Sequence, residues 1–156
     1  MPDKRVVVIF QDLDGVCNSK TSFRLEQRKG TENISDTLSE INCSNFQSIL
    51  DAVPDAKIVI SSSWRILHSF DYLKTKLTEY RIDAGKVIGV TPCVSSGDRA
   101  REITLWLEEH PEVTHYVILD DDSDILSHGE HAVLTTWEDG LLSTHVKAAI
   151  KILKKT

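Results

Sequence analysis

Residues 6–15 read Val-Val-Val-Ile-Phe-Gln-Asp-Leu-Asp-Gly, an apolar and largely β-branched run that ends in two aspartates and a glycine. A continuous apolar run predicts a strand buried on both faces, because a half-exposed strand would alternate apolar and polar residues. We therefore predict a first strand over residues 5–11. Gly15 suits the tight turn that must follow, since glycine tolerates backbone conformations that other residues avoid.

Four short segments later in the sequence are also predicted to be buried strands, at residues 57–61, 86–91, 116–119 and 132–136. Between them, apolar residues recur at helical spacing, as over residues 66–80, where an amphipathic helix is expected. Alternating strands and helices predict a parallel sheet with helices on both faces. We expect one three-layer, Rossmann-like α/β domain over residues 1–156, with a central five-stranded parallel sheet and a flexible insert loop at about 17–42.

The composition is that of a folded domain and argues against a membrane-spanning protein. The chain is 40% hydrophobic and 27% charged, as folded domains are, and its net charge of −6 argues against binding nucleic acid mainly through a basic surface. Its longest purely apolar run, residues 6–10, is too short to cross a bilayer. Three widely spaced cysteines indicate a reduced protein. We expect a cytoplasmic protein without a membrane partner.

Polar residues follow three of the predicted strands. Their carboxyl ends share one edge of a parallel sheet, so these side chains should meet there. Converging carboxylates need a cation among them, and hard oxygen ligands suit Mg²⁺. The residues are Asp12 and Asp14 after the first strand, Ser61 and Ser62 after the second, and Asp120 and Asp121 after the fourth.

Two aspartates one residue apart can take different chemical roles. Asp12, ionised, can attack phosphorus and form an aspartyl phosphate, while Asp14 can protonate the leaving oxygen and later accept a proton from water. Ser61 or Ser62 can bind phosphate, and Ser61 is favoured because it directly follows the apolar strand. Arg99, with Arg101 as the alternative, can supply the cation that phosphoryl transfer needs.

The ordered pattern of strand-Asp-x-Asp-Gly, strand-Ser, basic residue and strand-Asp-Asp resembles the haloacid dehalogenase (HAD) superfamily. The resemblance spans nearly the whole chain, from residue 6 to about 142. It implies that Asp12 is the nucleophile and Asp14 the acid/base. It also implies that Mg²⁺ is held by Asp12, the backbone carbonyl of Asp14 and Asp120, with Asp121 acting through water.

A narrower resemblance rests on three segments: Ile-Ser-Ser-Ser-Trp-Arg at 60–65, Arg-Ala-Arg-Glu-Ile at 99–103, and Tyr-Val-Ile-Leu-Asp-Asp at 116–121. They look like the HAD domains of Swiss army knife RNA repair proteins, and are similar in style to the phosphatase domain of polynucleotide kinase-phosphatases. That resemblance implies removal of phosphate from RNA or DNA ends. We take Arg65 as a candidate substrate contact, with pairing to an acidic residue at the rim of the site as the alternative. Neither insertion point is long enough for a substantial cap domain, so the site should be open to a bulky substrate.

Two alternatives use similar machinery. A nucleotidase or small-molecule phosphatase of the same superfamily would share every residue above. A phosphoacceptor module resembling a response-regulator receiver would need its acceptor after the third strand and a lysine after the fifth. Here those strands lead into Thr91-Pro92 and Thr136-Trp137, so the phosphatase hypothesis is preferred.

Overall fold

The computed structural model describes residues 4–156; residues 1–3 of the predicted domain lie outside the described residues. The strands are β1 (Val7–Gln11), β2 (Ala56–Ile60), β3 (Val87–Val90), β4 (His115–Asp120) and β5 (Ala132–Leu134). The helices are α1 (Lys20–Lys29), α2 (Glu40–Ala52), α3 (Trp64–Leu67), α4 (Phe70–Glu79), α5 (Arg99–Glu108) and α6 (Ser143–Leu153). Three 3₁₀ segments complete them: η1 (Ile34–Asp36), η2 (Ala84–Lys86) and η3 (Ser123–His131). Among these described helices, none combines the length and apolar character needed to span a membrane.

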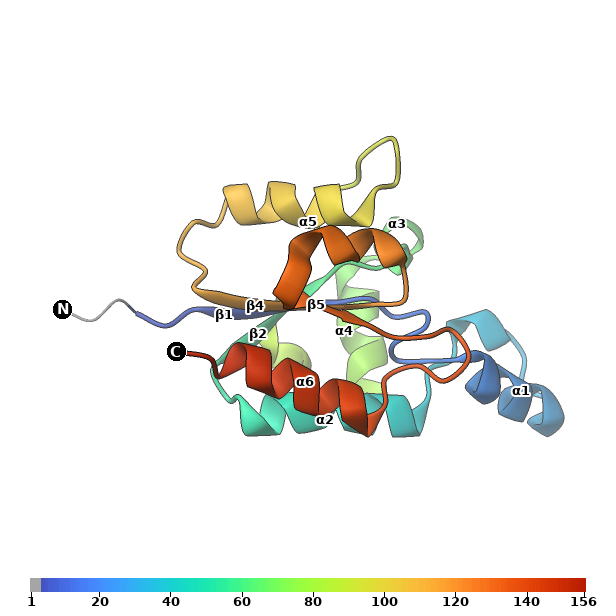
Figure 1. Cartoon of the computed structure of the whole chain (residues 1–156). Coiled ribbons are helices and arrows are strands. Elements are labelled where there is room, and N and C mark those ends of the chain that lie inside the picture. Colours follow the sequence, from blue (N-terminus) through green and yellow to red (C-terminus); the bar gives the residue numbers. More distant parts are fainter. Residues whose placement is uncertain (1–3) are drawn as a thin grey trace.

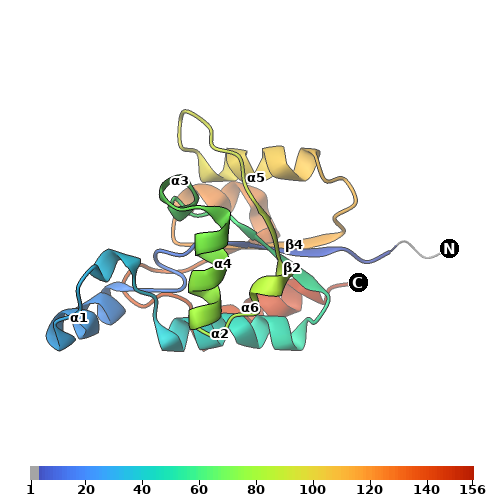
Figure 2. The same ribbon diagram turned by 180° about the vertical axis from the view of Figure 1, so that it is seen from behind.

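The five strands form one parallel sheet in the order β3-β2-β1-β4-β5, which confirms the predicted architecture. Helices cover both faces: α5 and η3 lie on one side of the sheet and α2 and α6 on the other (Figure 1). Helix α4 contacts the edge strand β3 and lies in the foreground of the reverse view (Figure 2). This arrangement puts β1 at the centre of the sheet, so the residues that follow it are flanked by the ends of β2 and β4.

The side chains of β1 alternate between two apolar cores. Val7 and Ile9 belong to the cluster that includes the buried residues of α2, α4 and α6. Val8 and Phe10 belong to the cluster with α5 and η3, where the Phe10 ring lies edge-on to Trp106 with centroids 5.4 Å apart. Side chains two residues apart on a strand share a face. Asp12, two residues after Phe10, therefore lies on the same face as Phe10, which α5 covers.

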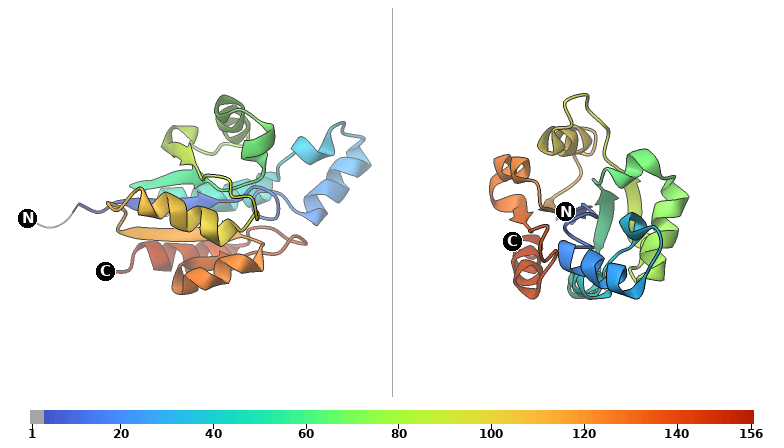
Figure 3. Two further views of the ribbon diagram at one scale, coloured as in Figure 1. Left: turned by 90° about the horizontal axis from the view of Figure 1, so that it is seen from above. Right: turned by 90° about the vertical axis from the view of Figure 1, so that its right-hand side faces the viewer.

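The predicted loop at 17–42 contains regular structure, which corrects that expectation. Helix α1 begins after Ser19, which forms a capping box with Ser22, and it ends at Gly30 with a left-handed φ of 74°. Its residues are mostly polar and exposed, so the segment lacks the apolar periodicity by which sequence reasoning detects helices. Helix α1 lies beyond the carboxyl ends of the strands and faces the viewer in the right-hand view of Figure 3. The flexibility of the segment stays a prediction.

Candidate active site

Backbone pairing brings the polar residues that follow β1, β2 and β4 into one row. The pairing of Gln11 with Ile60 and Leu119 continues by one residue, because the Asp12 N–H donates to the Leu119 carbonyl at 3.0 Å and the Ser61 N–H to the Gln11 carbonyl at 2.9 Å. Asp12 is therefore level with both Ser61 and Asp120. Side chains at matched positions of parallel strands point to the same face, which here is the face covered by α5.

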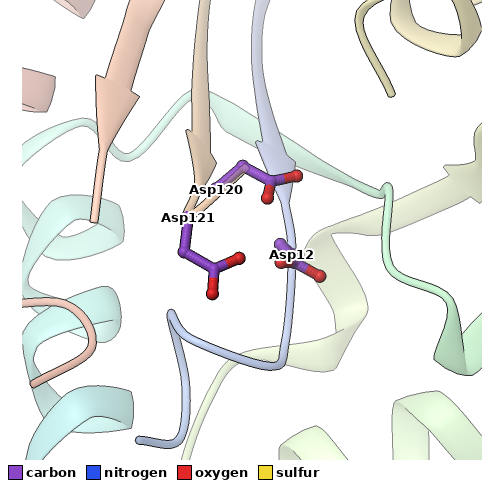
Figure 4. Close-up of side chains that lie close together, drawn as sticks. All are labelled: Asp12, Asp120 and Asp121. Atoms are coloured by element: carbon purple, nitrogen blue, oxygen red, sulfur yellow. The ribbon is translucent and has the colours of Figure 1, made fainter. Parts of the chain in front are cut away.

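Three carboxylates converge at this edge of the sheet. Asp12, Asp120 and Asp121 each offer an oxygen, and these oxygens lie within 4.8 Å of one another (Figure 4). Burial, followed by the charge of Asp120, raises the pKa of Asp12 well above its ordinary range. Burial likewise raises the pKa of Asp120 to about 6. A cluster of oxygen donors whose negative charge is disfavoured in this way fits a hard divalent cation such as Mg²⁺.

Gly15 makes room for the third carboxylate. Its φ of +80° is strained for any residue with a side chain, and a Cβ there would lie 2.2 Å from Oδ2 of Asp121. The Thr135 hydroxyl donates to the Gly15 carbonyl at 2.6 Å and so links the turn to the segment after β5. The glycine of the Asp-x-Asp-Gly motif is thus required both by its backbone conformation and by the position of Asp121.

Asp14 lies outside the carboxylate cluster and has its own hydrogen bonds. Its Oδ1 accepts from the Trp64 indole N–H at 3.1 Å and from the Asn18 amide at 3.0 Å. Asn18 also accepts from the Gly15 N–H and donates to the Thr37 carbonyl, which anchors it at both ends. Because both donors reach Oδ1, a proton on Asp14 belongs on Oδ2. Metal binding by the Asp14 backbone carbonyl stays a prediction.

The two serines after β2 differ in their hydroxyl groups. Oγ of Ser62 accepts from the Trp64 backbone N–H at 3.2 Å, whereas Oγ of Ser61 is buried and has no hydrogen-bond partner in the described part of the chain. An unpartnered buried hydroxyl costs about 1–3 kcal/mol, so it is expected to serve a ligand. Thr91, level with Ser61 at the end of β3, has a buried and unpartnered hydroxyl too. The Ser61 hydroxyl is thus free to bind a ligand whereas that of Ser62 is engaged, and phosphate binding by Ser61 stays a prediction.

Arg99 is the cation nearest the carboxylates. Its Nη1 lies 3.0 Å from Oδ2 of Asp120 and 3.5 Å from Oδ1 of Asp12, and its side chain is 14% exposed. It is the first residue of α5, and its backbone N–H donates to Asp124 at 2.9 Å. The alternative, Arg101, is exposed and forms no ion pair among the described residues. The structure thus places Arg99, and not Arg101, beside Asp12.

Arg65 is buried beside an acidic residue. Its side chain is only 4% exposed, and Nη2 lies 2.8 Å from Glu102. The remaining guanidinium contacts are hydrogen bonds to the carbonyls of Ser62, Thr91 and Pro92. These contacts engage four of the five N–H groups of a buried guanidinium, so Arg65 braces two loops, and substrate binding by Arg65 stays a prediction. The ion pair with Glu102 agrees with the alternative given for Arg65, that it pairs with an acidic residue.

Several residues in the site escaped the sequence analysis. Asn18 and Trp64 orient Asp14, and Thr91 extends the row of strand-end hydroxyls. Glu102 lies between the two arginines. A signal existed for Glu102 alone, because a charged residue among Ala100, Ile103 and Trp106, which recur at helical spacing, requires a buried partner.

Fold and site together define a HAD-type domain: a β3-β2-β1-β4-β5 parallel sheet with an Asp-x-Asp-Gly loop and a paired Asp-Asp at adjacent strand ends. The chain belongs to the family described as the HAD domain in Swiss Army Knife RNA repair proteins, whose profile matches residues 8–146. Among solved structures, it is similar to the HAD domain of effector protein Lem4 from Legionella pneumophila. That similarity has a TM-score of 0.56 and 17% identity, over 97% of this chain and 98% of that one, and it shows the shared fold. No curated protein matches the chain.

Proposed function

We propose that the protein is a Mg²⁺-dependent phosphomonoester hydrolase that works through an aspartyl phosphate on Asp12. The observation that carries the proposal is the convergence of Asp12, Asp120 and Asp121 within 4.8 Å, with Arg99 beside them. Asp14 stands apart from that cluster, oriented by two donors. This combination supplies a nucleophile, a cation site and a separate acid.

The proposed reaction has two steps. In the first, an Asp12 oxygen forms a bond to phosphorus while the bond from phosphorus to the leaving oxygen breaks, and Oδ2 of Asp14 gives that oxygen its proton. In the second, Asp14 takes a proton from the water that attacks the aspartyl phosphate. Inorganic phosphate then leaves, and the Asp12 carboxylate is restored.

Two side chains are placed to stabilise the charge that spreads over the transferred phosphoryl group. The Arg99 guanidinium is already beside Asp12, and the free hydroxyl of Ser61 is level with it on the neighbouring strand. Asp12, Asp120 and Asp121, with the Asp14 carbonyl, would hold Mg²⁺, which would neutralise further negative charge when bound. Fixed charges of this kind account for most of the catalysis in phosphoryl transfer.

We further propose that the substrate is a phosphorylated end of RNA or DNA. The family's RNA repair proteins support this class of substrate. The structure supports it as well, because α1 and η1 are the only helical elements between β1 and α2, and they are too short to form a separate lid. A site without a lid accepts a long polymer, whereas small substrates are more often enclosed. The receiver alternative loses support, since receivers have the strand order 2-1-3-4-5.

The test is phosphate release, with Mg²⁺ and with EDTA, from an oligonucleotide carrying a 3′-phosphate, one carrying a 5′-phosphate, and an aryl phosphate. Asp12→Asn serves as the inactive variant and Asp139→Asn, at an exposed loop position, as the matched control. Mg²⁺-dependent release from one oligonucleotide end, lost only in Asp12→Asn, supports the proposal and identifies the end. Release from the aryl phosphate alone assigns the protein to the small-molecule phosphatases. No release from any substrate contradicts the hydrolase proposal.

A further inference from the structure

Glu102 is a buried carboxylate with no part in the chemistry described so far. It lies on the inner side of α5 with Ala100, Ile103 and Trp106, and its side chain is 5% exposed. A buried charge without compensation costs several kcal/mol, so its partners must account for its presence. Those partners are two arginines, from two different segments of the site.

The two oxygens of Glu102 are divided between these arginines. Oε2 lies 2.8 Å from Nη2 of Arg65 and accepts from the Val94 backbone N–H at 3.0 Å. Oε1 lies 3.5 Å from Nε of Arg99, which is an ion-pair distance, and the buried Nε has no hydrogen-bond partner in the described part of the chain. Through Arg65, whose guanidinium donates to the Ser62 and Thr91 carbonyls, the carboxylate is tied to the segments that follow β2 and β3. The contacts with Arg65 and Val94 therefore hold the Glu102 carboxylate independently of Arg99.

Arg99 is consequently held from two sides. Its Nε faces Glu102, while Nη1 faces Asp120 at 3.0 Å and Asp12 at 3.5 Å. A guanidinium is planar and rigid, so the attraction of a buried carboxylate on its Nε side favours the orientation in which the Nη groups face the opposite way. The ionic chain from Arg65 through Glu102 and Arg99 to Asp12 thus links the segments after β1 and β2 through α5.

We propose that Glu102 is a positioning residue that fixes the plane of the Arg99 guanidinium, so that Nη1 faces the phosphoryl group transferred to Asp12. The inference rests on the proposed function, because it concerns the same reaction. Its competitor is a purely structural role, in which Glu102 only neutralises Arg65 and stabilises the loops. The two roles differ in whether the effect of removing Glu102 depends on Arg99.

The experiment compares Glu102→Gln with Glu108→Gln, an exposed position on the same helix, in Mg²⁺-dependent hydrolysis of the aryl phosphate. Glutamine keeps the size and one acceptor oxygen but removes the charge that faces Arg99. We expect kcat of Glu102→Gln to fall roughly 10- to 100-fold, as is usual when a residue that orients a functional side chain is lost. Glu108→Gln should match the wild type. In a protein that already carries Arg99→Lys, adding Glu102→Gln should lower kcat by less than threefold, because the guanidinium that Glu102 positions is gone.

Two results overturn the inference: a kcat within twofold of the wild type in Glu102→Gln, or the same fold loss in both backgrounds. A second measurement keeps the test independent of activity. In ¹⁵N NMR spectra, rotation of the Arg99 guanidinium about its Nε–Cζ bond should be faster in Glu102→Gln than in the wild type, and an unchanged rate overturns the inference. Absence of hydrolysis by the wild type contradicts the proposed function, and the NMR comparison then decides separately whether Glu102 holds Arg99.

Discussion

The carboxylate of Asp120 should destabilise the metal-free protein at neutral pH, and its replacement by asparagine should therefore stabilise the fold. Asp120 is 1% exposed, and burial raises its pKa from 3.8 to about 6. Its Oδ1 accepts from the Asp122 N–H and its Oδ2 from Arg99, and neither contact offsets the cost of burying the charge. Asparagine cannot ionise and escapes that cost.

The magnitude follows from the size of the pKa difference. A pKa raised from 3.8 to about 6 corresponds to about 3 kcal/mol, since a change of 1 in the pKa is worth about 1.4 kcal/mol. Between pH 3.8 and about 6, the folded protein keeps a proton on Asp120 that the unfolded chain has released. The free energy of unfolding therefore falls as the pH rises through this window and stays low above it.

Thermal denaturation in EDTA at pH 4 and at pH 7.5 tests this reasoning. At pH 7.5, we expect Asp120→Asn to melt roughly 6–12 °C above the wild type, given about 2–4 °C per kcal/mol for a domain of this size. The difference should nearly vanish at pH 4, and the exposed control Asp139→Asn should melt with the wild type at both. Saturating Mg²⁺ should raise the melting temperature of the wild type and leave that of Asp120→Asn unchanged. A lower melting temperature for Asp120→Asn at pH 7.5 in EDTA would refute the argument.

Three further substitutions test individual parts of the site. Gly15→Ala should lower the free energy of unfolding by about 1–3 kcal/mol, because alanine is strained at positive φ. It should also weaken Mg²⁺ binding, measured by calorimetry, because the added Cβ displaces Asp121. An unchanged Mg²⁺ affinity would contradict this. Trp64→Phe removes the indole N–H from Asp14 and should lower kcat roughly tenfold in steady-state assays while binding of inorganic phosphate persists. Ser61→Ala should raise the inhibition constant for inorganic phosphate without lowering the melting temperature, because the lost hydroxyl has no protein partner. A melting temperature several degrees lower would show that the hydroxyl serves the fold instead.

The sheet and its carboxylate cluster could be predicted from the sequence because each depends on a short, local signal. A buried parallel strand is a continuous apolar run, and parallel pairing brings all carboxyl ends to one edge. Asp12 and Asp120 are thereby placed together once the strands are recognised. The carboxylates and Ser61 needed no knowledge of side-chain packing to be brought to that edge.

Other features depend on contacts that no local pattern encodes. The predicted helix at 66–80 is two helices, because Ser69 caps α4 through the Tyr72 N–H and leaves Ile66 66% exposed. The apolar residues keep helical spacing across residues 68–69, so the break could not be predicted from the pattern. The roles of Arg65 and Glu102 likewise follow from their mutual contact, which joins residues 37 positions apart. A buried ion pair of this kind becomes visible only in the folded chain.

The most direct test of the central claim, that Asp12 is the nucleophile, is to trap the covalent intermediate. The wild-type protein would be mixed with excess aryl phosphate and Mg²⁺, quenched in acid and treated with borohydride, which reduces an aspartyl phosphate to homoserine. Mass spectrometry of the peptides then locates the reduced position. We expect homoserine at position 12, absent when Mg²⁺ or substrate is omitted. Phosphate release without any reduced aspartate, or with the reduction at position 14 or 120, would contradict it.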